Sequence, residues 1–166
     1  MHIGIVSDTH DRAATLSQAL DELRRRGVTV VLHCGDIESP SMISLFEGLT
    51  AHFVYGNCDD DRSGLRTAIS ALGATLHEPF GHLELTGRRL AFLHGDDAAL
   101  QRDLENSAHF DFLFHGHTHQ IEDRRVGPTR VINPGALHRA RPKSFAVLEL
   151  ETGRLETLAV ENEPRT

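Results

Sequence analysis

Three short apolar segments, each ending in polar residues and followed by a helical pattern, constrain the fold more than any other feature of this chain. They are residues 3–6, 28–32 and 52–55, and they lead into Ser7-Asp8-Thr9-His10, His33-Cys34-Gly35-Asp36 and Gly56-Asn57-Cys58-Asp59. Apolar runs of this length predict buried strands. Strands that alternate with helices predict an α/β domain with a mainly parallel sheet. We expect the polar residues to meet at one edge of that sheet, where open α/β folds bind ligands.

Each predicted strand is followed by apolar residues at helical spacing. The three helical faces consist of Leu16, Ala19, Leu20 and Leu23, of Met42, Leu45, Phe46 and Leu49, and of Leu65, Ala68, Ile69 and Leu72. This spacing predicts three helices that pack on the sheet through one face. We expect Asp11 to cap the first helix and Gly73 to end the third. Ser39 followed by Pro40 predicts the start of the second helix.

The second half of the chain changes to paired strands. Residues 80–94, 121–132 and 144–160 predict β-hairpins that turn near Thr86-Gly87, Gly127-Pro128 and Thr152-Gly153. A short helix is predicted near residues 97–107, and the apolar run 110–114 predicts another buried strand. Two packed sheets with helices outside accommodate this mixture. We expect residues 1–166 to form a single domain, because a chain of this length can bury one substantial core.

The composition indicates a protein of the cytoplasm. Hydrophobic residues make up 39% of the chain and charged residues 25%, as in soluble globular proteins. No apolar run approaches the ~20 residues that span a bilayer, so we expect no membrane partner. Cys34 and Cys58 are too few for a disulfide framework and fit a reducing compartment. The net charge of -7 argues against a general nucleic-acid-binding surface, so we expect no stable nucleic-acid complex.

A histidine-rich segment, His115-Gly116-His117-Thr118-His119, follows the predicted strand 110–114. His117 and His119 are two residues apart, so in an extended chain both imidazoles lie on the same side. Neutral imidazole nitrogens are ligands for Zn, Mn, Fe and Ni. Considered alone, however, the segment is more typical of a solvated loop than of a metal site.

Four other strand ends carry metal-ligand residue types, and they change the interpretation of the histidine pair. The full set is Asp8, His10, Asp36, Asn57, His94, His117 and His119. Two cations ~3.5–4 Å apart need imidazoles, carboxylates and one group that bridges them. Asp36 can bridge, because a carboxylate has two oxygens. Two dications would outweigh the charge of the two carboxylates, so the site would bind an anion such as a phosphate ester.

The order of these residues resembles the motifs of the calcineurin-like metallophosphoesterases. The motifs stand here as Asp8-Thr9-His10, Gly35-Asp36, Gly56-Asn57-Cys58-Asp59, His94 and Gly116-His117-Thr118-His119. The resemblance covers nearly the whole chain. The short length, the Gly-Asn-Cys-Asp variant and Asn133-Pro134-Gly135 are most similar to the compact bacterial and archaeal phosphodiesterase branch. This resemblance implies a four-layer αββα sandwich of two mixed sheets flanked by helices.

The resemblance also implies a reaction and a cofactor. A small phosphodiester would be hydrolysed by a hydroxide that bridges two divalent metal ions, with manganese expected first and Ni, Fe, Zn or Co as alternatives. Carried over, one metal would be held by Asp8, His10, Asp36 and His119, and the other by Asp36, Asn57, His94 and His117. The same resemblance places Asp36, Asn57, Cys58 and Asp59 at catalytic positions.

Cys58 departs from the larger family, in which this position is a histidine that protonates the leaving oxygen or stabilises the transition state. A thiol is a different proton donor and a poorer cation. We therefore expect phosphodiesters whose leaving group needs no proton to react best, and general phosphomonoesterase activity to be weaker. Asp59 either orients a ligand or caps a helix from the acidic run Asp59-Asp60-Asp61.

Two other functions stay open on the sequence. The same fold resembles a eukaryotic trafficking-coat subunit that works as a scaffold and whose metal-ligand set is eroded. The presence of His94, His117 and His119 here disfavours that alternative. The other is a nuclease or nucleotide phosphodiesterase of the same superfamily. The residues leave the physiological substrate open, and a homo-oligomer is an alternative to a monomer.

Several residues beside the motifs receive weaker interpretations. His33 and His115 either shape the surroundings of the ligands or are buried structural histidines. Segment 133–136 predicts a tight turn, with a place beside the metal site as an alternative. Segment 139–143, with Arg139, Arg141 and Lys143, is interpreted as a solvated loop, with phosphate binding as the alternative. The remaining histidines are expected to be structural or exposed: His2, His52, His77, His82, His109 and His138.

Overall fold

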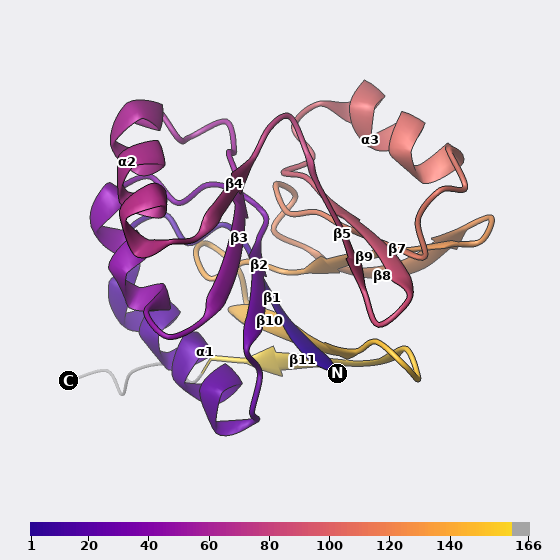
Figure 1. Cartoon of the computed structure of the whole chain (residues 1–166), viewed down its shortest axis with the longest axis horizontal. Helices are drawn as coiled ribbons and strands as arrows, with labels where there is room; N and C mark the ends of the chain where they lie inside the picture. The colour runs from indigo at the N-terminus through magenta and orange to yellow at the C-terminus, as the bar shows by residue number, and fades with distance from the viewer. Residues whose placement is uncertain (161–166) are drawn as a thin grey trace.

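The computed structural model describes residues 1–160, which form two β-sheets with helices on their outer faces (Figure 1). The first sheet contains, in spatial order, β11 (Arg154–Ala159), β10 (Ser144–Glu149), β1 (His2–Val6), β2 (Val30–His33), β3 (Thr50–Val54) and β4 (Thr75–His77). Strands β1 to β4 run parallel, and β10 and β11 extend the sheet in antiparallel register. The parallel strands direct their carboxyl ends to one edge.

The second sheet contains, in spatial order, β5 (Gly81–Leu85), β6 (Arg88–Phe92), β7 (Phe112–Phe114), β9 (Thr129–Pro134) and β8 (Ile121–Val126). Its three central strands run parallel, and β5 and β8 pair antiparallel at the two edges. The predicted hairpin turns are confirmed, since β5 pairs with β6, β8 with β9 and β10 with β11.

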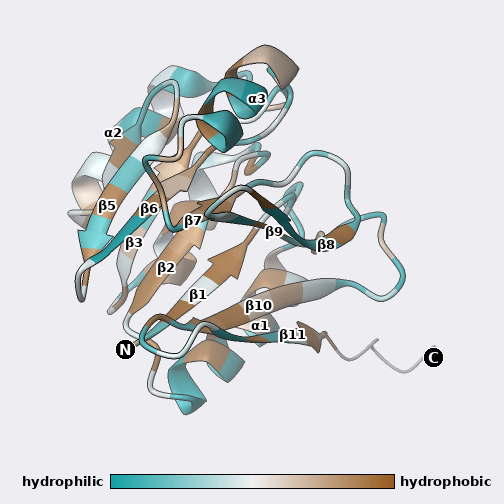
Figure 2. Cartoon of the chain, turned by 90° about the vertical axis from the view of Figure 1, so that its right-hand side faces the viewer, coloured by the Kyte–Doolittle hydropathy of each residue, from teal (hydrophilic) through white to brown (hydrophobic). Residues whose placement is uncertain are grey.

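Three clusters of buried apolar side chains fill the space between the layers. Between the sheets lie residues such as Ile5, Leu32, Phe92 and Phe114. On the outer face of the first sheet pack the helices α1 (Ala13–Arg25), α2 (Arg62–Leu72) and the 3-10 helix η1 (Pro40–Phe46). Helix α3 (Ala98–Asn106) covers the outer face of the second sheet through Leu104. Figure 2 shows apolar residues along β1, β2 and β10, as this burial requires. The predicted αββα sandwich is confirmed.

The second predicted helix differs from a regular α-helix. Residues 40–46 form a 3-10 helix that begins at Pro40, as expected, but the side chain of Ser39 accepts no capping hydrogen bond from the helix. The hydroxyl of Ser44 donates to the carbonyl of Ser41 at 3.0 Å, a local bond that competes with α-helical pairing. Gly48, at φ 79°, turns the chain two residues after the helix ends. The segment is therefore too short and too rich in serine for a long α-helix.

The predicted cap at Asp11 is wrong. Helix α1 begins after Arg12, which makes no side-chain cap. Asp11 adopts φ 56°, and its carboxylate accepts hydrogen bonds from the backbone (2.9 Å) and hydroxyl (2.5 Å) of Ser39. It therefore joins the ends of β1 and β2. Strand β4 is absent from the sequence prediction, because Thr75 is exposed, Leu76 and His77 are only partly buried, and the three residues form no apolar run.

None of the helices in residues 1–160 is long and apolar enough to cross a membrane. The predicted single domain extends to residue 166, and its last residues lie outside the described part of the chain.

Candidate metal centre

The strand ends of both sheets meet at one edge of the molecule. The backbone N–H of Asp8 donates to the carbonyl of Gly35 (3.1 Å), and that of Gly116 donates to the carbonyl of His94 (2.9 Å). Between the sheets, the backbone N–H of His117 donates to the carboxylate of Asp8 (3.2 Å). These bonds bring together motifs that lie more than a hundred residues apart in sequence.

One group of ligand atoms comes from the ends of β1, β2 and β7. Nε2 of His10 lies 3.5 Å from Oδ2 of Asp36. Nε2 of His119 lies 3.3 Å from Oδ1 of Asp8. The rings of His10 and His119 are centred 5.5 Å apart and tilted toward each other. These are the four residues that the family resemblance assigns to one metal.

The second group shares Asp36 with the first. Nε2 of His94 lies 3.4 Å from Oδ2 of Asp36 and 3.1 Å from Oδ1 of Asn57. The ring of His117 lies edge-on to that of His94, with centroids 5.1 Å apart. Asp36 therefore lies between the two groups, as a bridging carboxylate must.

Two buried side-chain atoms at this edge lack a hydrogen-bond partner within residues 1–160: Oδ1 of Asp8 and Nε2 of His10. Buried polar atoms are rarely left unpaired, because the lost hydration is costly. Asp8 and His10 form a set with His119 in which one ligand atom of each residue lies within 4.8 Å of the others, and Asp36 takes part in two further sets. Imidazole nitrogens and carboxylate oxygens suit Mn, Zn, Fe, Co and Ni. The residues present therefore fit divalent metal ions.

The backbone at this edge adopts conformations that side chains rarely take. Positive φ values occur at Asp8 (54°), His10 (43°), Asp36 (58°), His117 (64°) and His119 (58°). Non-glycine residues in this region are uncommon and cluster at functional sites. Because the turns are so tight, the neighbouring glycines cannot be replaced without a clash. A Cβ at position 56 would meet the carboxylate of residue 36, and one at position 116 the hydroxyl of residue 7.

The family model of the calcineurin-like phosphoesterase superfamily domain matches residues 1–153. The chain belongs to this superfamily. The predicted family is therefore confirmed, and with it the hydrolysis of phosphoric esters as the class of activity.

Relatives of known name agree with this membership. Phosphodiesterase MJ0936 of Methanocaldococcus jannaschii is 32% identical over 138 residues, which cover 81% of this chain and 83% of the relative. A probable metallophosphoesterase of Methanothermobacter thermautotrophicus is 31% identical over 166 residues, covering 94% and 90%.

Among solved structures, an archaeal phosphodiesterase superposes with a TM-score of 0.88 at 27% identity, covering 96% of this chain and 99% of that one. It supports the compact branch that the motifs predict. Vps29 of Entamoeba histolytica in complex with zinc superposes with a TM-score of 0.67 at 20% identity, covering 97% and 100%. That similarity shows the shared fold alone.

At the phosphoesterase centre, Asp36 and His94 each shift the pKa of the other. Burial alone would raise the pKa of Asp36, but the hydrogen bond and charge of His94 hold it well below its usual range. Burial opposes the charged form of His94, yet its partner Asp36 raises the pKa of His94 to about 9. Burial raises the pKa of Asp8. Without metal, the imidazole of His94 is therefore positively charged beside the carboxylate of Asp36.

Asp59 supports the turn that carries Asp36. Its carboxylate accepts hydrogen bonds from the backbone N–H groups of Asp36 (3.0 Å), Ile37 (2.7 Å), Glu38 (2.7 Å) and Gly56 (2.7 Å). Burial raises the pKa of Asp59, and these donors oppose that effect. The helix-cap alternative is wrong for Asp59, because α2 is capped by Asp61, which accepts from the N–H of Gly64.

Two neighbours of His10 were missed by the sequence interpretation. Nδ1 of His10 lies 2.6 Å from Oε1 of Glu38, an arrangement in which Nδ1–H donates and Nε2 stays free for a ligand. His138, expected to be structural or exposed, is half-buried, and its ring is centred 5.2 Å from that of His10. The available signal for Glu38 was its place two residues after Asp36, on the same turn.

His33 and His115 are both buried beside the ligands. The backbone N–H of Gly35 donates to Nδ1 of His33 (3.1 Å), so Nε2–H faces the hydroxyl of Thr9 (3.1 Å). Burial lowers the pKa of His33 to about 3. Nε2 of His115 lies 2.9 Å from Glu122. Both histidines therefore hold the loops that carry the ligands.

Cys58 lies at the centre but does not replace a cationic histidine. Its backbone N–H donates to Oδ1 of Asp36 (2.8 Å), and its sulfur accepts from Nδ2 of Asn57 (3.3 Å). Burial and the nearby charge of Asp36 raise the pKa of Cys58 to about 11. The side chain is therefore a neutral thiol at neutral pH.

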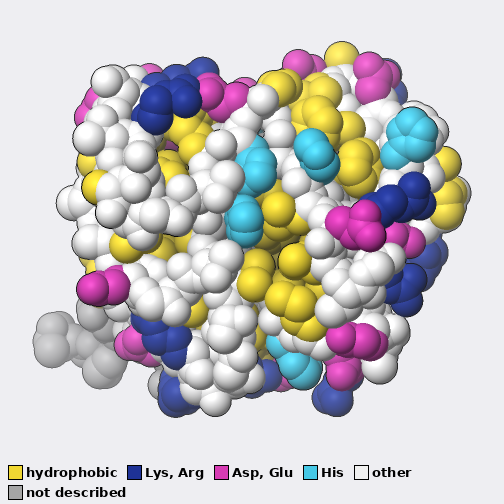
Figure 3. Space-filling model, in the orientation of Figure 1, with side chains coloured by type: hydrophobic (Ala, Val, Ile, Leu, Met, Phe, Trp, Pro, Cys, Tyr) yellow, Lys and Arg dark blue, Asp and Glu magenta, His cyan; other side chains and the backbone are white. Residues whose placement is uncertain are grey.

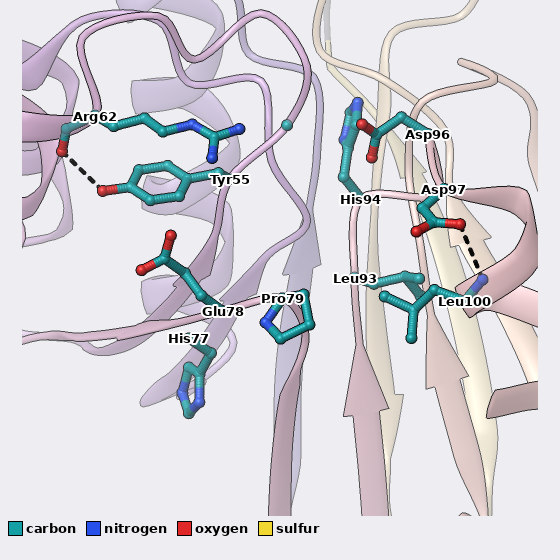
Figure 4. A pocket seen from close by; sticks show the side chains of 12 residues that line it. Tyr55, Arg62, His77, Glu78, Pro79, Leu93, His94, Asp96, Asp97 and Leu100 are labelled. Atoms are coloured by element: carbon teal, nitrogen blue, oxygen red, sulfur yellow. Dashed lines mark hydrogen bonds between the residues drawn. The ribbon is translucent and has the colours of Figure 1, made fainter. Parts of the chain in front are cut away.

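A cavity of about 220 Å³ opens beside His94, between residues that follow β3 and β4 of the first sheet and residues that follow β6 of the second (Figure 4). On one side, the guanidinium of Arg62 lies 4.9 Å from the ring of Tyr55, whose hydroxyl donates to the carbonyl of Arg62 (2.7 Å). Asp96 and Asp97 line the opposite side. Histidine side chains also gather along the hollow between the two halves on the face in Figure 3. The cavity places a mixed polar and aromatic surface next to a predicted ligand.

Proposed function

We propose that the chain is a phosphodiesterase that depends on two divalent metal ions held at this edge, with manganese as the first candidate. This proposal is supported above all by two buried atoms that lack a hydrogen-bond partner in the described part of the chain, Oδ1 of Asp8 and Nε2 of His10. Both lie beside the carboxylate of Asp36, which is close to both groups of predicted ligands. Asp8, His10, Asp36 and His119 would hold one ion. Asp36, Asn57, His94 and His117 would hold the other.

When bound, such ions lower the pKa of coordinated water and neutralise charge on phosphate oxygens. The protein supplies the geometry around them. Glu38 orients His10 through Nδ1, and Asp59 fixes the turn of Asp36. Asn57 is exposed at its strand end, where its side chain can meet a phosphate oxygen.

The substrate class follows from Cys58 and from the cavity beside His94. A neutral thiol cannot stabilise negative charge as an imidazolium does, so diesters with good leaving groups should react best. The name of the Methanocaldococcus relative, a phosphodiesterase, supports a diester over a monoester. The cavity offers room for one small ester group. Both cysteines are free, which supports our further proposal that the enzyme works in the cytoplasm.

The test is hydrolysis of bis(p-nitrophenyl) phosphate with Mn²⁺ added, beside metal analysis of the purified protein. The Asp36→Asn, His117→Ala double variant should lose at least about two orders of magnitude in kcat/KM. The matched control is the Asp103→Asn, His109→Ala variant, whose two side chains are exposed outside the centre. Wild-type activity no higher than that of the Asp36→Asn, His117→Ala variant would overturn the proposal. A metal-free protein whose stability ignores chelators would favour the scaffold alternative.

A further inference from the structure

The loop between β9 and β10 passes directly beside the metal edge. Near the end of β9, just before this loop, the side chain of Asn133 donates to the carbonyl of Gly116 (2.9 Å). Further along, the backbone N–H of Leu137 donates to the carbonyl of Ser7 (3.2 Å), next to Asp8. The loop is therefore attached to the ends of β7 and β1, both of which carry predicted ligands.

His138 connects this loop to His10. The two rings are centred 5.2 Å apart, and Nε of Arg12 donates to Nδ1 of His138 (3.2 Å). Arg12 precedes α1, so the amino end of that helix joins the loop at this point. Whatever occupies the surface beyond His138 lies close to the group of ligands that includes His10.

Four cationic side chains gather on that surface: Arg12, Arg139, Arg141 and Lys143 line one cavity of about 580 Å³. In residues 1–160, none of the four has a carboxylate within ion-pair distance, whereas eight other arginines do. The nearby carboxylate of Asp11 is occupied by Ser39. The chain as a whole is acidic, with a net charge of -7. A cluster of cations without carboxylate partners among the described residues, beside the predicted phosphate site, therefore favours an anionic ligand.

The opposite flank of the centre has different chemistry. The cavity beside His94 carries Asp96 and Asp97 along with Tyr55 and Arg62 (Figure 4). The carboxylates of Glu78, Asp96 and Asp97 outnumber the guanidinium of Arg62 in this lining, so an uncharged alcohol group fits there better than a second phosphate. The two flanks therefore distinguish the two ester groups of a diester.

We propose that the substrate is a phosphodiester whose one alcohol carries a further phosphate group, and that Arg139, Arg141 and Lys143 bind that phosphate. This inference rests on the proposed phosphodiesterase function and specifies its substrate. Guanidinium groups bind phosphate oxygens through paired hydrogen bonds, and an ammonium adds a point charge. The second phosphate sets the orientation: the phosphorylated alcohol lies toward His10, and the other alcohol toward His94.

The experiment compares thymidine dinucleotides with and without a 5′-phosphate, in the presence of Mn²⁺. The test variant is Arg139→Gln, Arg141→Gln, Lys143→Gln. The control is Arg102→Gln, Arg125→Gln, Arg154→Gln, which removes the same charge from α3, β8 and β11. Wild type and control should prefer the phosphorylated dinucleotide by about tenfold in kcat/KM, and the test variant should lose that preference.

Activity on bis(p-nitrophenyl) phosphate, which has no second phosphate, separates this inference from the proposed function. The test variant should retain that activity. An equal loss on every substrate, or no preference in the wild type, would overturn the phosphate site. If neither the wild type nor any variant hydrolyses a diester, the proposed function is wrong. Fluorescence anisotropy with the labelled dinucleotides then decides whether the cluster still binds the 5′-phosphate.

Discussion

The carboxylate of Asp59 accepts the backbone N–H of Asp36 at 3.0 Å, from beneath the turn that aims the Asp36 side chain at both groups of ligands. Asp59 is 2% exposed, and its two oxygens also take three further backbone donors. It therefore acts on the predicted metals through the shape of the turn.

Replacing Asp59 by Asn should weaken metal binding about 10–100-fold, because one acceptor oxygen is replaced by a donor and the turn of Asp36 loosens. The unpaired N–H groups should also cost about 1–3 kcal/mol of folding stability. Metal titration and urea unfolding measure the two effects. Asp60→Asn, at an exposed neighbour, is the control. Metal affinity equal to wild type would contradict the positioning role.

His117 and His119 should divide the metals between them. His119→Ala should weaken the ion held with Asp8 and His10, and His117→Ala the ion held with Asn57 and His94. Each variant should therefore retain one ion of two after mild dialysis, measured by elemental analysis, while His109→Ala retains both. Equal loss of both ions in either variant would show that the assignment is too simple.

Cys58→Ala should leave hydrolysis of bis(p-nitrophenyl) phosphate within about threefold of wild type, because a neutral thiol contributes little when the leaving group needs no proton. Cys58→His should raise activity on p-nitrophenyl phosphate relative to the diester. Steady-state kinetics on both esters measures this ratio. A loss of about a hundredfold in Cys58→Ala would instead give the thiol a direct role.

His33 should make the protein less stable as the pH falls. Its pKa is about 3 when folded and near the ordinary 6.5 when unfolded, so the unfolded chain binds the extra proton between these values. The contribution is complete above pH 6.5 and decreases below it by about 1.4 kcal/mol per pH unit. His33→Gln should show a shallower slope in urea unfolding from about pH 7 to 5, with chelator present and exposed His109→Gln as control. Parallel slopes would mean that His33 becomes protonated without unfolding.

Removing metal should lower the melting temperature. A ligand at about a hundred times its Kd stabilises the folded state by about 2.7 kcal/mol, and for a chain of this size each kcal/mol corresponds to about 2–4 °C. Differential scanning calorimetry with EDTA, and again after Mn²⁺ is restored, measures the shift. The Asp36→Asn, His117→Ala variant should show almost none. Identical wild-type melting with and without chelator would argue for the scaffold alternative.

The strand ends were predictable because they are local. An apolar run followed by Ser7-Asp8 or Gly35-Asp36 predicts a strand and its polar end without knowledge of the fold. Pairings across the molecule were not predictable in this way. Glu38 meets His10 because β1 and β2 are neighbouring strands of one sheet, and His138, 128 positions after His10, meets it because the chain returns from β9 of the second sheet to β10 of the first.

The positions of side chains in the folded structure also distinguish residues that have similar positions in the sequence. Asp59 and Asp61 look alike in sequence, yet one lies under the turn of Asp36 and the other caps α2. The loop with Arg139, Arg141 and Lys143 is predicted to be solvated, and both arginines are exposed. Its attachment to Ser7 through Leu137, and the cavity that these cations share with His138, could not be predicted from the sequence.

The left-handed backbone at Asp8, His10, Asp36, His117 and His119 has a practical meaning for protein engineering. Each such residue costs about 1 kcal/mol or more relative to a relaxed conformation, and glycine would remove most of that cost. When no metal is bound, selection for thermostability alone should therefore enrich glycine at His10, His117 and His119, but not at Asp8 and Asp36, whose carboxylates accept the N–H groups of His117 and Cys58. The resulting proteins would be inactive, so a screen for thermostable variants of this enzyme must select for activity in every round.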